Sequence, residues 1–131
     1  MARRILVVDD DEKMLGLYQA ILSSEGFDVL TASRGEDVLK LAIENMPDLI
    51  LLDVVMPKKD GGGVAQDLSE NNKTKNIPII FLTSIISEEE AKAKHGKISG
   101  GFIISKSSNR TELVQKIKEV LSASGRKRSY S

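Results

Sequence analysis

Short runs of aliphatic residues alternate along the chain with longer segments of helical periodicity, and this alternation limits the folds that the chain can adopt. Aliphatic runs of about four to eight residues are typical of strands that are buried on both faces of a sheet. Strands that alternate with helices predict a parallel sheet, because each crossover must return across the sheet. We therefore expect strands at 5–8, 27–32, 49–53, 77–82 and 102–105.

The segments between and after these runs carry apolar residues at the spacing of amphipathic helices. Gly26 is placed to end the first helix and Pro47 to end the second. The helices are expected around 14–22, at 35–45, around 64–68, at 87–96 and at 110–123. Five strands and five helices in alternation predict an α/β fold with a doubly wound parallel sheet.

A length of 131 residues fits one domain with one hydrophobic core. We place this domain at 1–124, because the segment 125–131 is basic and has no apolar period. That last segment is expected to be a flexible tail or the start of a linker.

Charge and cysteine content exclude several classes of function. Lysine plus arginine and aspartate plus glutamate number 19 each, so the net charge predicts no contact with nucleic acid or with a membrane surface. Disulfides and thiolate metal sites are excluded, because the chain contains no cysteine. The apolar run at 5–8 is far shorter than a signal-peptide core or a membrane span, which predicts a cytoplasmic protein.

Polar residues stand where four of the five expected strands end. The carboxyl ends of parallel strands meet at one edge of the sheet, and ligands bind at that edge in open α/β sheets. Asp53 closes the most apolar strand and is the main candidate for a reacting group. The full set is Asp9, Asp10, Asp53, Thr83, Ser84 and Lys106.

The residue types in this set suit the binding of a phosphoryl group. Three carboxylates at one edge repel one another, and a hard cation such as Mg²⁺ relieves that repulsion. The hydroxyl of Thr83 and the ammonium of Lys106 are what a phosphoryl group needs for hydrogen bonding and charge neutralisation. Asp53 is then a candidate nucleophile, which would attack phosphorus and become an aspartyl phosphate.

Each of these groups also has an ordinary structural interpretation. The acidic run 9–12 suits a helix start, and strand-end hydroxyls suit the cap of the next helix. Lys106 alone would be a solvated lysine, and the single histidine, His95, is expected to be a surface residue without chemistry. The convergence of several strand ends favours a site over these separate interpretations.

Several motifs in this order resemble the receiver domain of two-component response regulators. They are Val-Val-Asp-Asp at 7–10, Leu-Leu-Asp-Val-Val-Met-Pro at 51–57, Asp-Gly at 60–61, Phe-Leu-Thr-Ser at 81–84, and Lys106. The similarity covers about residues 3 to 123, which is nearly the whole chain.

The resemblance implies a flavodoxin-like sheet of order 2-1-3-4-5. It also implies that Asp53 accepts a phosphoryl group from a histidine kinase or a histidine phosphotransfer protein. Asp10 and Asp53 would bind Mg²⁺ together with the backbone carbonyl of Val55, and Asp9 would act mainly through water. Thr83 would move to the phosphoryl group and Lys106 would pair with it. The face formed by the fourth helix, fifth strand and fifth helix would serve dimerisation or partner binding.

The chain departs from the family's pattern around Lys106. Ser107 follows the lysine where the family usually has proline. The family's switch aromatic corresponds to Ile103, whereas Phe102 lies one residue earlier. Either a slip of one residue puts Phe102 in the switch role, or the aromatic movement coupled to Thr83 is absent.

Two other functions remain as alternatives. The first is a receiver that is not phosphorylated and serves as a constitutive protein-binding module, which the intact acidic set disfavours. The second is a hydrolase of the haloacid dehalogenase type, because Asp9 and Asp11 form an Asp-x-Asp pair after the first strand. The hydrolase interpretation leaves Asp53 without a role and is the weakest of the three.

Overall fold

The computed structural model describes residues 2–54, 61–83, 97–98, 101–106 and 108–129. These ranges contain one sheet of order β2-β1-β3-β4-β6-β5. Its five parallel strands confirm the predicted order 2-1-3-4-5, with β6 as the fifth predicted strand. Their bounds are Arg4–Val8 (β1), Asp28–Ala32 (β2), Leu49–Asp53 (β3), Ile79–Thr83 (β4) and Gly101–Ser105 (β6).

A sixth strand, β5, covers only Lys97–Ile98 and pairs antiparallel with β6 at the edge of the sheet. The sequence does not predict this strand, because two residues are too few to show any hydrophobic period. Its presence does not alter the parallel order of the other five.

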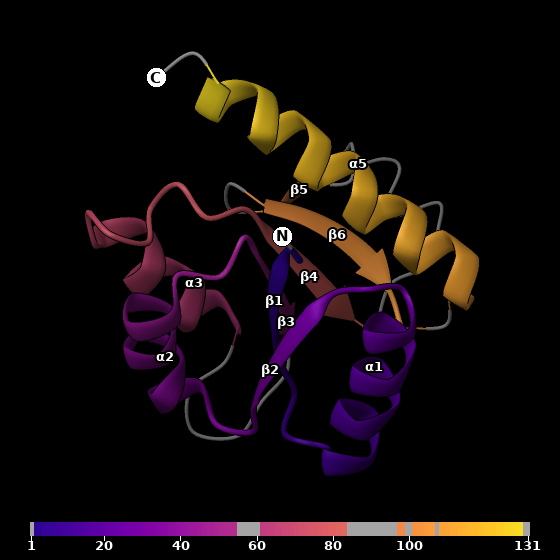
Figure 1. The fold of residues 1–131 in the computed structure, drawn as a ribbon. Coiled ribbons are helices and arrows are strands. Elements are labelled where there is room, and N and C mark those ends of the chain that lie inside the picture. Colours follow the sequence, from indigo (N-terminus) through magenta and orange to yellow (C-terminus); the bar gives the residue numbers. More distant parts are fainter. Residues whose placement is uncertain (1, 55–60, 84–96, 99–100, 107, 130–131) are drawn as a thin grey trace.

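Helices cover both faces of the sheet (Figure 1). Helix α1 (Glu12–Ser24) and helix α5 (Arg110–Ser129) lie on one face, whereas α2 (Val38–Asn45) and α3 (Gly61–Glu70) lie on the other. A 3₁₀ turn at Gly35–Asp37 replaces the start of the second predicted helix.

These four helices match four of the five predicted ones, and the helix predicted at 87–96 lies outside the described residues. The last helix continues to Ser129 instead of ending at 123, so it enters the basic segment. In the described ranges, no helix combines the length and the apolar character needed to cross a membrane.

Strand residues divide strictly between two hydrophobic cores. Ile5 and Val7 belong to the core under α1 and α5, and Leu6 and Val8 belong to the core under α2 and α3. The same division holds in β3, where all five residues are buried. Because successive side chains of a strand point to opposite faces, the position of each residue fixes the core it enters.

The ends of the first two helices both use the left-handed backbone region. Gly26 follows α1 with φ at 91°, and the backbone N–H of Phe27 donates to the carbonyl of Leu22 at 3.1 Å. Met46 ends α2 with φ at 46°, although glycine is the usual residue for such a cap. The sequence predicts both helix ends, but it gives no sign that Met46 adopts a conformation that is costly for a side chain.

Ion pairs join the end of α1 to α5. Glu25 lies 3.0 Å from the guanidinium of Arg110 and 3.6 Å from the ammonium of Lys118. The hydrogen bond from Arg110 lowers the pKa of Glu25 below its ordinary value, and the charges of Lys118 and Arg110 add to this effect. These contacts hold α1 against α5 on the face that also carries the charged residues described below.

Replacing Met46 with glycine should stabilise the protein. The left-handed region costs about 1–2 kcal/mol for a residue with a side chain, which exceeds the extra entropy cost of about 0.5–1 kcal/mol for glycine. We expect Met46→Gly to raise the free energy of unfolding by about 0.5 kcal/mol in urea denaturation. Gly26→Ala is the matched reverse change, because a Cβ there meets no atom within 4 Å and only the backbone is strained. It should destabilise, and a loss of stability in Met46→Gly would contradict the argument.

Replacing Glu25 with glutamine should destabilise the protein in a pH-dependent way. A lowered pKa means that the charged carboxylate contributes stability above its ordinary value of 4.5 and loses it as the pH falls. We expect Glu25→Gln to lower Tm by about 1–2 °C at neutral pH, and the difference should shrink and disappear as the pH falls below 4.5 into acid. Thermal melts across this range test it, with Glu119→Gln on the exposed side of α5 as the control. A difference that persists in acid would refute the assignment.

Candidate functional site

Charged side chains from three strands meet at the carboxyl edge of the sheet. Asp9 follows β1, Asp53 is the last residue of β3, and Lys106 follows β6. The ladder between β1 and β2 extends to this point, since the N–H of Asp9 donates to the carbonyl of Ala32 at 3.1 Å. The structure therefore brings together residues that are 97 positions apart in the sequence.

Strand alternation places these three residues on the same face. Asp9, Asp53 and Lys106 each stand two positions after a residue of the core under α1 and α5, and those residues are Val7, Leu51 and Ile104. Side chains two positions apart on a strand share a face. The charged groups thus extend that core's face beyond its apolar end.

Lys106 forms ion pairs with both buried carboxylates. Its ammonium lies 2.9 Å from Oδ2 of Asp9 and 3.2 Å from Oδ2 of Asp53. The two acidic side chains are 0 % and 5 % exposed, and that of Lys106 is 19 % exposed. Burial alone would lower the pKa of Lys106, but the hydrogen bond and charge of Asp9, with the charge of Asp53, raise it above its ordinary value.

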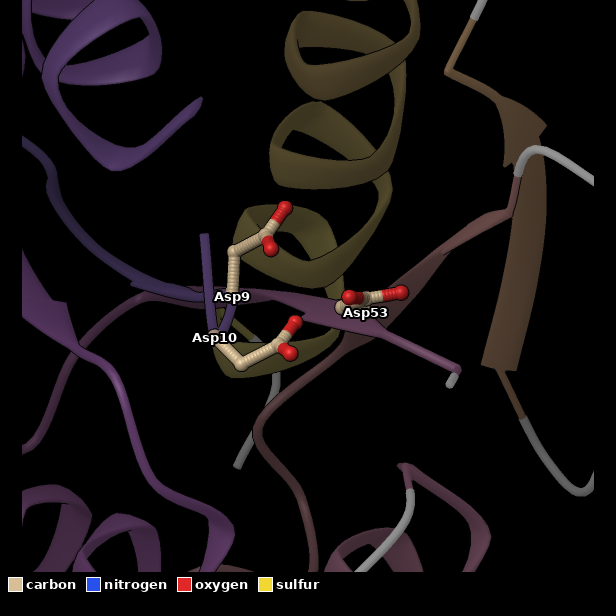
Figure 2. A group of neighbouring side chains, drawn as sticks. All are labelled: Asp9, Asp10 and Asp53. Atoms are coloured by element: carbon tan, nitrogen blue, oxygen red, sulfur yellow. The ribbon is translucent and has the colours of Figure 1, made fainter. Parts of the chain in front are cut away.

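The two aspartates after β1 have different surroundings. Oδ1 of Asp9 accepts from the N–H of Asp11 at 2.9 Å, so both oxygens of this buried carboxylate have donors. Asp10 is exposed, and it lies beside Asp9 and Asp53 at the ends of the strands (Figure 2). Asp11 caps α1 through its own side chain, which accepts from the N–H of Lys13. Of the three clustered aspartates, Asp10 is therefore the most open to an incoming ligand.

The carboxylate oxygens at this edge of the sheet fit a divalent cation. One carboxylate oxygen from each of Asp9, Asp10 and Asp53 lies within 4.8 Å of the others. Two ligand oxygens on opposite sides of Mg²⁺ are about 4.2 Å apart, so this group could hold the ion with little movement or through a water. The cluster can bind a metal ion, and oxygen-only ligands favour a hard one.

Thr83 ends β4 on the opposite face of the sheet and is 4 % exposed. It pairs in register with Ser105, and its carbonyl accepts the N–H of Lys106 at 2.8 Å. The backbone thereby connects the two strand ends that carry the predicted hydroxyl and ammonium. Val55, Ser84, His95 and Ser107 lie outside the described residues.

Phe102 and Ile103 lie on opposite faces of β6. Phe102 packs against the core under α1 and α5, and the Lys116 ammonium lies 5.1 Å from its ring centre. Ile103 is buried in the other core, in register with Phe81. A slip of one residue would exchange the two faces, so Phe102 does not stand in for Ile103. Ile103 thus shares the face of Thr83, and Phe102 does not.

Sequence reasoning missed one contact of the site. It assigned Lys106 to a phosphoryl group and did not foresee the direct pairing with Asp9, because a pair 97 positions apart leaves no local pattern in the sequence.

Comparison with known proteins identifies the relatives of this chain. The family model described as the response regulator receiver domain matches residues 5–118. The alkaline phosphatase synthesis transcriptional regulatory protein PhoP of Bacillus subtilis is 46% identical over 84 residues, which cover 64% of this chain and 34% of PhoP. The transcriptional regulatory protein CpxR of Klebsiella pneumoniae is 37% identical over 118 residues, which cover 90% of this chain and 49% of CpxR. The chain thus spans half or less of these relatives.

Solved structures show the same architecture over nearly the whole chain. A CheY-like receiver domain protein from Methanospirillum hungatei has a TM-score of 0.83 at 26% identity, and the match covers 97% of this chain and 99% of that one. The chemotaxis protein CheY4 of Vibrio cholerae has a TM-score of 0.80 at 28% identity, and the match covers 92% and 99% of the two chains.

Removing the ammonium of Lys106 should destabilise the metal-free protein. Lys106→Met leaves two buried carboxylates without a counter-charge, so we expect the free energy of unfolding to fall by about 3 kcal/mol. Added Mg²⁺ should restore more stability in the variant than in the wild type, because no ammonium competes for the carboxylates. Urea denaturation with and without Mg²⁺ measures both effects. Lys13→Met, an exposed lysine on α1, is the control, and an equal loss there would refute the argument.

Proposed function

Because the chain belongs to the response regulator receiver domain family, we propose that Asp53 is its phosphoacceptor. A receiver domain is the phosphorylation-accepting module of two-component signalling. The single observation that carries the assignment is the position of Asp53 at the end of the central strand β3, between an acidic pair and the ammonium of Lys106. Asp9 also pairs with Lys106, but it follows the neighbouring strand β1 and both of its oxygens have donors.

The proposed reaction is an in-line displacement at phosphorus. A carboxylate oxygen of Asp53 forms a bond to phosphorus as the bond from phosphorus to the donor's imidazole nitrogen breaks. A small acyl phosphate can serve in the same way, with its carboxylate as the leaving group. Lys106 lies 3.2 Å from Asp53 and is in reach of the oxygens of the transferred group, whose negative charge it would neutralise. The transfer is stoichiometric, so the domain turns over no external substrate.

Asp10 and Asp53, with the backbone carbonyl of Val55, are the proposed ligands of Mg²⁺. Asp9 is proposed to act through water, which agrees with its burial and with the donors on both of its oxygens. A bound Mg²⁺ would neutralise charge on the phosphoryl oxygens during transfer. The side chains that would orient the phosphoryl group are otherwise already held in place by the sheet.

Phosphorylation is proposed to act through Thr83 and the strand beside it. The backbone hydrogen bond from the N–H of Lys106 to the carbonyl of Thr83 gives a direct connection from the phosphoryl site to β6. Ile103, which is buried against Phe81, would carry the change by repacking rather than by an aromatic flip. The readout surface is the face that includes β6 and α5, which would take part in homodimerisation or partner binding.

The proposed phosphoryl donor is a sensor histidine kinase or a histidine phosphotransfer protein. The support for this partner is membership of the family together with an acidic site whose most exposed member, Asp10, faces the solvent. The alternative of a receiver that binds partners without being phosphorylated makes the opposite prediction about labelling.

Incubation with a small acyl phosphate tests the assignment of Asp53. We expect one phosphoryl group per chain in the presence of Mg²⁺, little labelling without it, and none in Asp53→Asn, as measured by intact-protein mass spectrometry. Asp11→Asn is the matched control, because asparagine also caps a helix and Asp11 is outside the metal cluster. This control should be labelled like the wild type.

Three outcomes would contradict the assignment of Asp53. Labelling of Asp53→Asn at the wild-type level would place the phosphoryl group elsewhere. Absence of both labelling and Mg²⁺ binding in the wild type would favour the binding module that is never phosphorylated. Multiple turnover of an external phosphate ester would favour the hydrolase.

A further inference from the structure

The segment that joins β6 to α5 is held at three points. The N–H of Lys106 donates to the carbonyl of Thr83 on β4 at 2.8 Å. Two residues later, the N–H of Ser108 donates to the carbonyl of Ser105 at 3.0 Å. Asn109 then caps α5 through its side chain, which accepts from a backbone N–H of the first turn at 2.9 Å. The backbone before and after Lys106 is therefore fixed to its surroundings.

The bond from Ser108 closes a turn around Lys106. A hydrogen bond between an N–H and the carbonyl three residues earlier is typical of a β-turn, and here it joins the residue before Lys106 to the second residue after it. Serine at 107 does not restrict its own φ, as a proline would. The turn thus depends on the bond from Ser108 for a constraint that the residue type at 107 does not provide.

The position of the ammonium depends on the orientation of this backbone. A lysine side chain extends about 6 Å from its Cα, so a tilt of about 20° at the backbone displaces the ammonium by about 2 Å. The ammonium lies 2.9 Å from Asp9 and 3.2 Å from Asp53, and a displacement of this size away from Asp53 breaks that contact. Only 19 % of the side chain is exposed, so it has little room to compensate by changing rotamer.

We propose that Ser108 is a positioning residue for Lys106, and that its backbone N–H, bonded to Ser105, keeps the ammonium directed at Asp53 during phosphoryl transfer. Ser108 does not touch the phosphoryl group and acts only through Lys106. Its side chain has no part in this role, because the bond comes from the backbone. The kinetic part of this inference rests on the proposed function of Asp53, whereas the effect on the resting pairs of Lys106 does not.

Proline removes the N–H of Ser108 and tests its kinetic role. Ser108→Pro should lower the rate of Asp53 labelling by a small acyl phosphate about tenfold or more, because small misplacements of a reacting group cost large factors in rate. Ser108→Ala keeps the N–H and should be labelled within about twofold of the wild-type rate. Thr111→Pro is the matched control for a proline near the site, because N–H groups in the first turn of a helix have no partner within it. This control should also be labelled at the wild-type rate.

A double-mutant cycle shows whether the effect passes through Lys106. In the Lys106→Met background, Ser108→Pro should have no further effect on the labelling rate. An equal slowing in both backgrounds would mean that the proline disturbs the site in another way, and the positioning role would be refuted.

Two NMR measurements on the metal-free protein test the inference without phosphorylation. In the wild type, the backbone N–H of Ser108 should exchange with water at least about tenfold more slowly than that of Thr111, after correction for the intrinsic rate of each residue. In Ser108→Pro, the ammonium protons of Lys106 should exchange at least about threefold faster than in the wild type, because the ammonium loses acceptors. The measurement on the wild type stays decisive if the proline variant does not fold.

The outcomes separate this inference from the function proposed for Asp53. If the wild type is not labelled, that function fails, and the two exchange measurements still decide the role of Ser108. If the N–H of Ser108 is not protected, or if Ser108→Pro leaves the ammonium exchange unchanged, the positioning role is refuted. The same conclusion follows if Ser108→Ala is labelled as slowly as Ser108→Pro.

Discussion

The pairing of one ammonium with two buried carboxylates is the interaction on which the site depends. Asp9 and Asp53 are removed from solvent, and burial of two like charges without compensation would cost several kcal/mol. Lys106 supplies that compensation from β6, on the far side of β4. One ammonium against two buried carboxylates leaves the resting site with a net negative charge. An incoming cation and phosphoryl group change this charge distribution, which links ligand binding to the position of Lys106.

The sheet makes this pairing possible through its strand order. β1 and β3 are neighbours, so Asp9 and Asp53 meet directly, and β4 separates β3 from β6. A lysine is long enough to reach across the intervening strand, where a short side chain would not reach. Thr83 ends that intervening strand and is connected through its backbone to Lys106. Structural changes at Asp53 and at Lys106 would therefore both affect β4, the strand between them.

Most of the fold follows from local patterns in the sequence. Buried strands and amphipathic helices leave strong periodic signals in the sequence. Because the carboxyl ends of parallel strands lie at one edge of the sheet, the strand assignments alone predict that Asp9, Asp53 and Lys106 lie close together. The pattern did not reveal β5, which is too short, or the extension of α5 to Ser129, since that last segment is basic and has no apolar period. Contacts such as that of Lys106 with Asp9 depend on packing between distant segments and have no sequence period.

The two cores on opposite faces of the sheet also restrict how the length of this chain can change during evolution. An insertion or deletion of one residue inside β3 would carry Asp53 from the face of Lys106 to the face of α2 and α3, and would invert every apolar residue beyond the change. The same event in a connecting loop, such as 71–76 before β4, leaves the faces unaltered. Variation in length is thus confined to loops, while the strands keep a fixed count of residues up to each functional group.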